Sequence, residues 1–275
     1  MFREAGPEFY NEHYYRSQCG GHEQFDAFDG WHLDPIRRRA LTLARIGPGQ
    51  RILDIGCGRG EMVLTCALRG AQAVGVDFSP HAVRLARELL DKFNVRAATA
   101  IVQMDAADLG FTPNQFDRIL MLDLVEHISE ERLRRLIGQC HRLLKPGGRV
   151  VIHTGPTREF IRYGQRVKRL IARLRRQPVP AMVTWEGEAR LAGHCNLHSR
   201  ESLLNLLAVF EKRWAGYEFT VDGGWAKRLA RACRLTRYLA FNLWAVGVKA
   251  GGSHDAGEKW LAGDRDGRSP AHRVD

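Results

Sequence analysis

The sequence predicts an α/β fold in which helices cover both faces of a mostly parallel sheet. Between residues 50 and 154, apolar runs of strand length alternate with segments of helix length, which is typical of βαβ units. The first run, residues 52–55, leads into glycines at three alternate positions. Such glycines let a strand turn sharply into a helix and bring the backbone close to a ligand at the helix N-terminus. Seven strands are predicted in all.

The elements beside this turn follow in order. Residues 35–46 have the apolar spacing of an amphipathic helix, which a Gly-Pro-Gly run ends before the first strand. After the turn, residues 61–69 suit a helix, and a second strand, residues 73–76, ends at Asp77. An acid about twenty residues past the first glycine can accept both hydroxyls of a ribose, as in nucleotide-binding βαβ units.

Three more strands lie in the same alternating region. Residues 100–104 lead into Asp105 and Ala106, and residues 116–122 lead into Asp123. A Pro-Gly-Gly run then ends a helix and starts the fifth strand. The acids therefore follow strand ends, where ligands of parallel sheets bind.

The rest of the chain completes the sheet. Residues 199–210 are predicted to form a helix with Ser199 as its N-cap. The last two strands, residues 213–221 and 241–249, are predicted to form an antiparallel edge. Residues 251–275 are rich in Gly, Asp, Arg and Ser, and we predict a disordered tail.

The glycine turn distinguishes two kinds of βα nucleotide site. A dinucleotide site uses G-x-G-x-x-G, which needs a glycine at position 61, where this chain has Glu61. The D-x-G-x-G-x-G run from Asp54 suits a ligand without phosphates and with a charged amino-acid tail. In these residues the sequence resembles motif I of the class I S-adenosylmethionine (SAM) dependent methyltransferases, and the later motifs follow in that family's order.

The resemblance implies a Rossmann-like seven-stranded doubly wound sheet and SAM as the cofactor, with S-adenosylhomocysteine as product. It implies that the glycine turn shapes the amino-acid end of the cofactor site. Asp77 would take the ribose, Asp105 with Ala106 the adenine, and Leu122 with Asp123 the methionine side. The predicted cofactor-binding residues are Tyr14, Asp54, Gly56, Cys57, Gly58, Gly60, Asp77, Phe78, Asp105, Ala106, Leu122 and Asp123.

The domain organisation follows from the same resemblance. Residues 35–250 would form the SAM-binding domain, with residues 156–198 as a substrate-side insertion after the fifth strand. Residues 1–34 would form a lid, and their aromatic side chains could equally cap the open end of the sheet. These aromatics are Phe9, Tyr10, Tyr14, Tyr15, Phe25, Phe28 and Trp31.

The loop after the fourth strand is predicted to carry the chemistry. Methyl transfer is an in-line displacement at carbon, and a hydroxyl acceptor must also lose its proton. In the family this loop faces the sulfonium, which brings Glu126 and His127 within range. We predict His127 as general base, because imidazole titrates near neutrality, although an N-cap or adenine-side contact would also explain it. His194, which resembles a pre-helix histidine of ubiquinone-pathway O-methyltransferases, and Glu126 complete the predicted catalytic set.

The same residues allow a metal interpretation. Asp123, Glu126 and His127 resemble an acid-x-x-Glu-His group that holds a divalent ion, together with a later histidine, in terminal 2′-O-methyltransferases of small RNAs and some quinone O-methyltransferases. His194 could be that later histidine, with Mg²⁺ or Mn²⁺ as the ion. Because Glu-His-Ile is widespread in metal-free methyltransferases, the interpretation that we favour contains no metal ion.

Composition and charge indicate the cellular compartment and the kinds of partner that the protein could bind. No run approaches the about 18–20 apolar residues of a membrane span, and the N-terminus lacks a signal pattern, so we expect a cytoplasmic protein. The six cysteines form no C-x-x-C pair and read as reduced thiols. The net charge of +11 is concentrated in two segments. Between Arg158 and Arg176 there are eight basic residues and one acid, and between Trp225 and Leu239 five basic residues and no acid.

The first basic segment also has apolar residues at helical spacing, so it predicts an amphipathic helix. Three interpretations remain open: a helix on an anionic membrane surface, a phosphate-binding surface for RNA, or an ordinary helix whose apolar face packs on the sheet. Peripheral membrane association would involve both basic segments, and nucleic acid is the less favoured partner.

Together these observations predict a SAM-dependent methyltransferase that methylates a hydroxyl, in preference to nitrogen or carbon, of a small or lipid-linked metabolite such as a sugar, polyketide or quinol-like acceptor. One alternative is an RNA 2′-O-methyltransferase with a divalent metal. The other is an inactive SAM-binding scaffold that the basic helices recruit to a membrane. The sequence names neither the acceptor nor the oligomeric state.

Overall fold

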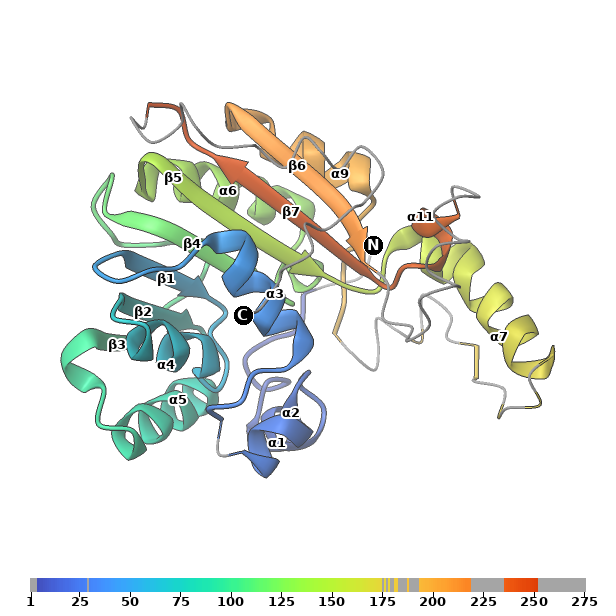
Figure 1. Ribbon diagram of the computed structural model, residues 1–275, viewed down its shortest axis with the longest axis horizontal. Helices are drawn as coiled ribbons and strands as arrows, with labels where there is room; N and C mark the ends of the chain where they lie inside the picture. The colour runs from blue at the N-terminus through green and yellow to red at the C-terminus, as the bar shows by residue number, and fades with distance from the viewer. Residues whose placement is uncertain are drawn as a thin grey trace, which may run out of the picture.

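The fold was analysed in a computed structural model, which describes residues 4–28, 30–174, 193–218 and 235–251, together with the single residues 176, 178, 181, 182 and 187. The predicted disordered tail after residue 251 lies outside the described residues. Residues 219–234, which include most of the second basic segment, also lie outside them. Figure 1 shows one twisted sheet flanked by helices, with one helix projecting from its side.

Seven strands form a single sheet in the order β3-β2-β1-β4-β5-β7-β6, as predicted. Strands β1 to β5 are parallel, and β7 is antiparallel to both β5 and β6. The predicted antiparallel edge is confirmed, because the last two strands, β7 and β6, pair antiparallel at one edge of the sheet, with β6 outermost. The strands are β1 Arg51–Ile55, β2 Gln72–Asp77, β3 Thr99–Gln103, β4 Phe116–Leu122, β5 Leu144–Thr154, β6 Lys212–Glu218 and β7 Asn242–Val248.

Helices cover both faces of this sheet, as the doubly wound prediction requires (Figure 1). One face packs against α3, α4 and α5, and the other packs against α6 and α9. Apolar side chains of the central strands alternate between the two cores, with Ile52 in one and Leu53 in the other. The helices and helical turns are α1 Glu12–Ser17, α2 His22–Ala27, α3 Pro35–Ala44, α4 Glu61–Leu68, α5 Pro80–Lys92, η1 Arg96–Ala98, η2 Val125–His127, α6 Glu130–Leu143, η3 Phe160–Gly164, α7 Gln165–Leu174, α9 Arg200–Leu206, η4 Leu207–Val209 and α11 Thr236–Leu239.

Local sequence explains where several helices begin. Asp34 and Ser79 each accept a hydrogen bond from a backbone N–H in the first turn, and a proline follows each of them. Ser199 caps α9 as predicted, and Ser202 completes a capping box. The Pro-Gly-Gly run is a correction: α6 ends at Leu143 and β5 begins at the next residue, so the run lies within the irregular start of β5.

The N-terminal segment lies over the carboxyl ends of the parallel strands. Tyr10 and Tyr15 are buried in a small core with Ala82 and Leu85 of α5, whereas Trp31 stays exposed. Aromatic side chains of the segment therefore cover the end of the sheet where the predicted site lies. In the described part of the chain, every helix is too short or too polar to span a bilayer.

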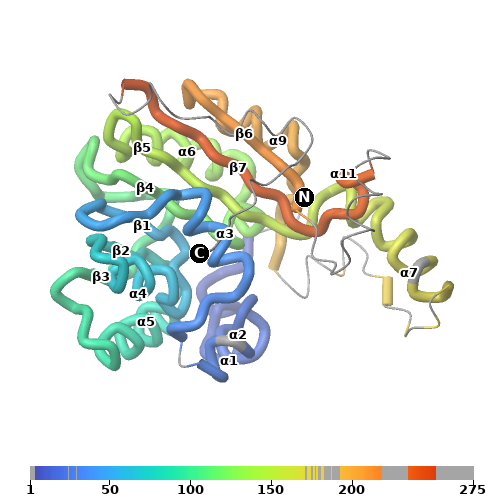
Figure 2. The backbone as a smooth tube through the Cα atoms, in the orientation of Figure 1, coloured from blue at the N-terminus to red at the C-terminus, as the bar shows by residue number. Residues whose placement is uncertain are grey.

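The predicted basic insertion is helical over residues 158–174. A π-helical turn, η3, follows β5 and continues into α7. Both drawings show α7 extending away from the sheet, with α11 beside its start (Figures 1 and 2). The insertion therefore does not cover the sheet in the way that α3 to α6 do.

Candidate active site

A cavity of about 670 Å³ lies between the N-terminal segment and the carboxyl ends of β1, β2, β4 and β5. All three predicted catalytic residues line it, and so do ten of the twelve predicted cofactor-binding residues. These ten are Tyr14, Gly56, Cys57, Gly58, Asp77, Phe78, Asp105, Ala106, Leu122 and Asp123. The sheet thus brings together residues that are far apart in the sequence.

Asp54 and Gly60 do not line the cavity, which corrects the place we predicted for them. Asp54 is buried behind the turn, and this burial raises its pKa to about 7. Gly60 has a φ of 86°, and a Cβ there would lie 2.9 Å from the Cβ of Ala86 on α5. A glycine is therefore required at this position so that α4 and α5 can pack closely.

Asp77 is held in the cavity by backbone groups. Its Oδ2 accepts from the N–H of Gly58 at 3.0 Å, and its Oδ1 accepts from the N–H of Ser79 at 2.9 Å. The hydroxyl of Tyr15 also donates to Oδ1 at 3.5 Å. Burial raises the pKa of Asp77, while these hydrogen bonds lower it. These contacts fix the carboxylate at the cavity wall, and its role in binding a ribose stays a prediction.

Arg59, in the middle of the glycine turn, joins this turn to the N-terminal segment. Its Nη1 donates to the carbonyl oxygen of Tyr15 at 2.6 Å, and its Nη2 donates to that of Gly20 at 2.9 Å. The guanidinium also pairs with Glu61 at 2.7 Å and lies over the ring of Phe25. No local pattern predicts this role, because the contacts join residues about forty positions apart.

Arg37 is a second residue that sequence reasoning missed. It projects from α3 into the cavity wall, where it pairs with Asp34 and lies 3.8 Å from Glu61. A guanidinium beside the glycine turn suits the carboxylate of an amino-acid ligand. In the sequence it is one of three consecutive arginines, and nothing there distinguishes it.

Asp105 lines the cavity just after the end of β3, and its carboxylate is paired with Arg132. Its Oδ1 accepts from the N–H of Ala107, and Arg132 of α6 lies 2.6 Å from its carboxylate. Arg132 also pairs with Glu4, whose carboxylate accepts from the N–H of Ser129. An ion-pair network thus holds the start of the N-terminal segment at the predicted adenine end.

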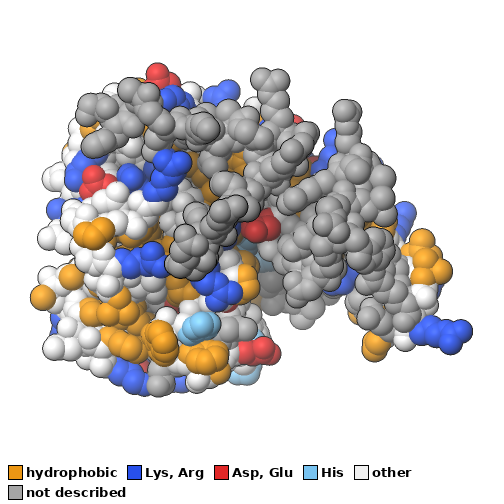
Figure 3. Space-filling view, viewed as in Figure 1, with side chains coloured by type: hydrophobic (Ala, Val, Ile, Leu, Met, Phe, Trp, Pro, Cys, Tyr) orange, Lys and Arg blue, Asp and Glu red, His pale blue; other side chains and the backbone are white. Residues whose placement is uncertain are grey.

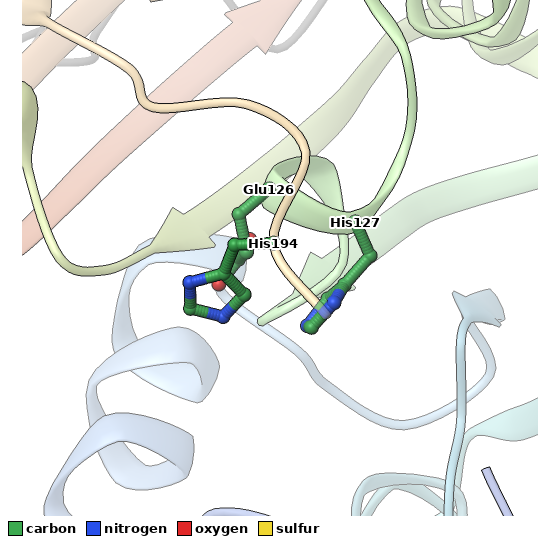
Figure 4. Close-up of side chains that lie close together, drawn as sticks. All are labelled: Glu126, His127 and His194. Carbon is green, nitrogen blue, oxygen red and sulfur yellow. The ribbon is translucent and has the colours of Figure 1, made fainter. Parts of the chain in front are cut away.

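Glu126, His127 and His194 form a cluster on the other side of the cavity (Figure 4). One potential ligand atom from each lies within 4.8 Å of the others, and the two imidazole rings are 4.7 Å apart. Glu126 and His127 belong to η2, directly after β4, and His194 comes from the loop before α9. The structure therefore brings the three predicted catalytic residues together.

The backbone of Glu126 holds the loop that carries His194. The N–H groups of Cys195 and Asn196 both donate to its carbonyl oxygen, at 2.8 and 3.0 Å. Its side chain is also held, since the Thr154 hydroxyl donates to Oε2 at 2.9 Å. Burial, and next the negative charge of Asp123, raise the pKa of Glu126 to about 7.

His127 has a pKa lowered to about 3, first by burial and then by the neighbouring His194. Its Nδ1 lies 3.0 Å from the Tyr10 hydroxyl and 3.4 Å from the carbonyl oxygen of Gly193. The carbonyl oxygen can only accept, whereas the Tyr10 hydroxyl can donate to Nδ1 or accept from it, so the shorter of the two contacts fits either tautomer of the ring. His127 is therefore neutral at pH 7 and a weaker base than the sequence suggested.

Asp123 and His153 form a further pair beside the cluster. Asp123 has a left-handed φ of 54°, and its Oδ1 lies 2.6 Å from Nδ1 of His153. Burial opposes both charges, but each partner's charge prevails, so the pKa of Asp123 is lowered and that of His153 is raised. Nε2 of His153 is buried without a hydrogen-bond partner among the described residues.

The cluster also fits a divalent metal ion. One carboxylate and two imidazoles, with the Asp123 carboxylate nearby, are donors that such ions accept. A cation would offset the repulsion between Glu126 and Asp123, and the low pKa of His127 keeps its imidazole unprotonated, as a ligand must be. The metal alternative thus gains geometric support that our favoured metal-free interpretation did not anticipate.

Comparison with known proteins identifies the central part of the chain. Residues 52–148 match a family described as "Methyltransferase domain". An uncharacterized methyltransferase of Synechocystis sp. is 37% identical over 129 residues, which cover 47% of this chain and 53% of that protein. These residues are therefore similar to a methyltransferase domain, and the seven-stranded sheet around them has the Rossmann-like fold of class I SAM-dependent methyltransferases.

A second relative and a solved structure are also similar to this chain. A ubiquinone biosynthesis O-methyltransferase of Pseudomonas syringae pv. tomato is 35% identical over 123 residues, or 44% of this chain and 51% of that protein. This chain therefore spans about half the length of the curated relatives that it matches. The solved phosphoethanolamine N-methyltransferase 2 of Haemonchus contortus, in complex with S-adenosylhomocysteine, has the same fold, with a TM-score of 0.60 and 20% identity over 88% of this chain and 60% of that one.

The matched region divides the cavity into two parts. The glycine turn, Asp77, Asp105 and η2 lie inside the methyltransferase domain match. Tyr10, Arg37, His153 and His194 lie outside it. The family match therefore includes the glycine turn together with Glu126 and His127, whereas the other side chains that close the cavity lie in parts of the chain that it does not cover.

Proposed function

We propose that the chain is an active methyltransferase that transfers the methyl group of SAM to a hydroxyl of a small or lipid-linked acceptor, with a quinol-like ring as the preferred class. One observation carries the proposal: Glu126, His127 and His194 line the same cavity as the residues that suit SAM. A hydroxyl needs a proton acceptor beside the methyl group, whereas binding of SAM alone needs none.

The chemistry of the cluster favours Glu126 as the proton acceptor. Its pKa of about 7 is well matched to a general base at neutral pH. The Thr154 hydroxyl orients the carboxylate, and the neutral imidazole of His127 lies in the same cluster beside it. This assignment moves the base from His127, where the sequence placed it, to its neighbour.

A divalent ion held by Glu126, His127 and His194 is a second form of the same proposal, which the close approach of their ligand atoms favours. When bound, such an ion would lower the pKa of an acceptor hydroxyl. The roles of the chain's own residues then change, because Glu126 would bind the cation and the Asp123–His153 pair, which also lines the cavity, would be left to accept the proton.

An aromatic acceptor suits the rest of the cavity wall. Tyr10, Tyr14, Leu124, Ile128 and Phe241 give that wall apolar and aromatic surface near the cluster. One of the matched relatives is named as a ubiquinone biosynthesis O-methyltransferase, and its acceptor class agrees with this surface. The proposal thus extends from a hydroxyl to an apolar ring that carries it.

The deciding experiment incubates the full chain with methyl-labelled SAM and a host-cell extract, with and without EDTA. The label is then partitioned between organic, acid-soluble and acid-precipitable fractions. Label in the organic fraction, absent with the Glu126→Gln variant, is the expected result. Ribonuclease-sensitive label in the precipitate would establish the RNA alternative, and no label despite tight S-adenosylhomocysteine binding would establish the inactive scaffold. Loss of label with EDTA, restored by Mn²⁺ or Mg²⁺, would select the metal form.

A further inference from the structure

An apolar stripe on the projecting helix faces solvent. Tyr163, Val167, Leu170 and Leu174 recur at the spacing of one helical face, and their exposed fractions are 43, 37, 55 and 76%. Isolated exposed apolar residues are common, but four on one stripe of a short helix mark an interaction surface. Phe160, on the same predicted apolar face, is buried against Phe241, so the part of that face from Tyr163 to Leu174 is the part that stays exposed.

Basic side chains border this stripe. Arg162, Arg166, Lys168 and Arg173 are exposed along η3 and α7, and Arg176 is exposed just beyond. The space-filling view shows hydrophobic and basic side chains next to one another at the projecting end of the molecule (Figure 3). The one acid of the segment, Glu159, lies before η3 and is partly buried.

The root of the helix is fixed to the body, which sets the direction of the stripe. Gly164 packs so closely on the segment before β7 that a Cβ there would lie 2.1 Å from the carbonyl oxygen of Tyr238. The rings of Phe160 and Phe241 are 5.3 Å apart, and those of Tyr163 and Tyr238 are 5.5 Å apart. Since Phe241 also lines the cavity, the base of α7 lies beside the cavity.

We propose that η3 and α7 dock the protein on an anionic lipid surface, with the Tyr163–Leu174 stripe in the headgroup boundary and the flanking arginines and lysine on the lipid phosphates. Charge complementarity selects this occupant, because an apolar stripe with exposed basic side chains beside it is the pattern of an interfacial helix. A second copy of α7 would bring like charges together, and RNA would leave the stripe uncovered. The inference does not depend on the proposed acceptor, but docking would bring the cavity beside the membrane.

The test measures partition of the full chain onto vesicles by co-sedimentation. Vesicles of phosphatidylcholine and phosphatidylglycerol in equal parts are expected to bind the protein, and vesicles of phosphatidylcholine alone are expected to bind at least about tenfold less. Raising the salt should release the protein, because surface charges are then screened. Equal binding to both vesicle types, or none to either, would overturn the proposal.

Variants separate the stripe from its flanks. Leu170→Glu with Leu174→Glu should lower partition about a hundredfold, roughly tenfold for each leucine withdrawn from the lipid. Leu68→Glu, at an equally exposed leucine of α4, is the matched control and should bind normally. Arg166→Gln with Arg173→Gln should lower partition about tenfold or more, whereas Arg134→Gln with Arg135→Gln on α6 should not.

Two further measurements test whether each variant is folded and whether the stripe binds a second copy of the chain. S-adenosylhomocysteine binding by calorimetry should be unchanged in every variant, which establishes that each is folded and separates this test from the proposed reaction. The mass of the protein in solution should be the same for the wild type and for Leu170→Glu with Leu174→Glu. A dimer that the double variant dissociates would replace the lipid surface with a second copy and overturn the proposal.

Discussion

The two sides of the cavity are built in different ways. On the cofactor side, backbone groups of the glycine turn and of the end of β2 do the positioning: the N–H groups of Gly58 and Ser79 hold Asp77, and the N–H groups of Gly56 and Cys57 hold the turn on Val76. On the acceptor side, side chains from the N-terminal segment, η2, β5 and the loop at residues 193–198 converge from distant parts of the sequence. A short motif can specify the first arrangement, but the second requires the whole fold.

The strongest way to break this comparison is to alter the acceptor side alone. Glu126→Gln and His194→Ala should each lower kcat by about a hundredfold or more, the usual contribution of a positioned acid–base group. S-adenosylhomocysteine affinity, measured by calorimetry, should change less than about threefold, because the cofactor side is intact. Glu130→Gln and His81→Ala are the matched controls, and neither residue lines the cavity. A parallel loss of cofactor affinity would show that the two sides are not separable.

The reverse change tests the cofactor side. Asp77→Ala should weaken S-adenosylhomocysteine binding by about an order of magnitude or more, the scale of a lost charged hydrogen-bond acceptor. Asp108→Ala, an exposed acid away from the cavity, should leave the affinity unchanged. If calorimetry gives the same affinity for Asp77→Ala and the wild type, the placement of the ribose is wrong.

The pH dependence should depend on the acceptor side. Glu126 has a pKa of about 7 and accepts a proton only when it is ionised, so kcat should rise about tenfold per pH unit below 7 and level off above it. The stability of the folded protein should fall, not rise, as the pH increases over this range. Because the folded-state pKa is raised, the contribution of Glu126 is fully present below its unfolded pKa and is lost as the pH rises through about 7. Glu126→Gln should reduce the fall in Tm over that range, and an unchanged fall would contradict the assignment.

The smallest expected effect concerns the contact that joins the two sides. Tyr15→Phe removes only the 3.5 Å hydrogen bond to Asp77 and keeps the ring packed. Cofactor affinity should fall about two- to threefold, as expected for one long, weak hydrogen bond. Tyr163→Phe on α7 provides the control. A loss as large as that of Asp77→Ala would mean that Tyr15 orients the carboxylate.

The same contrast explains how much the sequence predicted. The strands around the glycine turn, the helix start at Ser199 and the ten cofactor-side residues in the cavity follow from local patterns. Gly60 was misplaced because its reason lies on another helix, in the Cβ of Ala86. The pairing of Asp123 with His153 was missed for a similar reason, since it depends on the register of β4 with β5.

Electrostatic properties were harder to predict than positions. The sequence placed His127 in the cavity but gave it an ordinary imidazole pKa, whereas burial beside His194 lowers that pKa to about 3. Likewise, the apolar spacing of α7 was evident, but only the structure assigns its face to solvent. Burial is a property of the assembled chain, so patterns in the sequence leave it open.

Glu126 contacts the chain at both ends of the insertion, where the chain leaves β5 and where it returns before α9. The hydroxyl of Thr154 contacts the side chain of Glu126, and the N–H groups of Cys195 and Asn196 contact its carbonyl oxygen. The chain thus leaves and re-joins the body at a single staple. Because both ends of the insertion are held at Glu126, the length and composition of the insertion can change without moving Glu126 in the cavity.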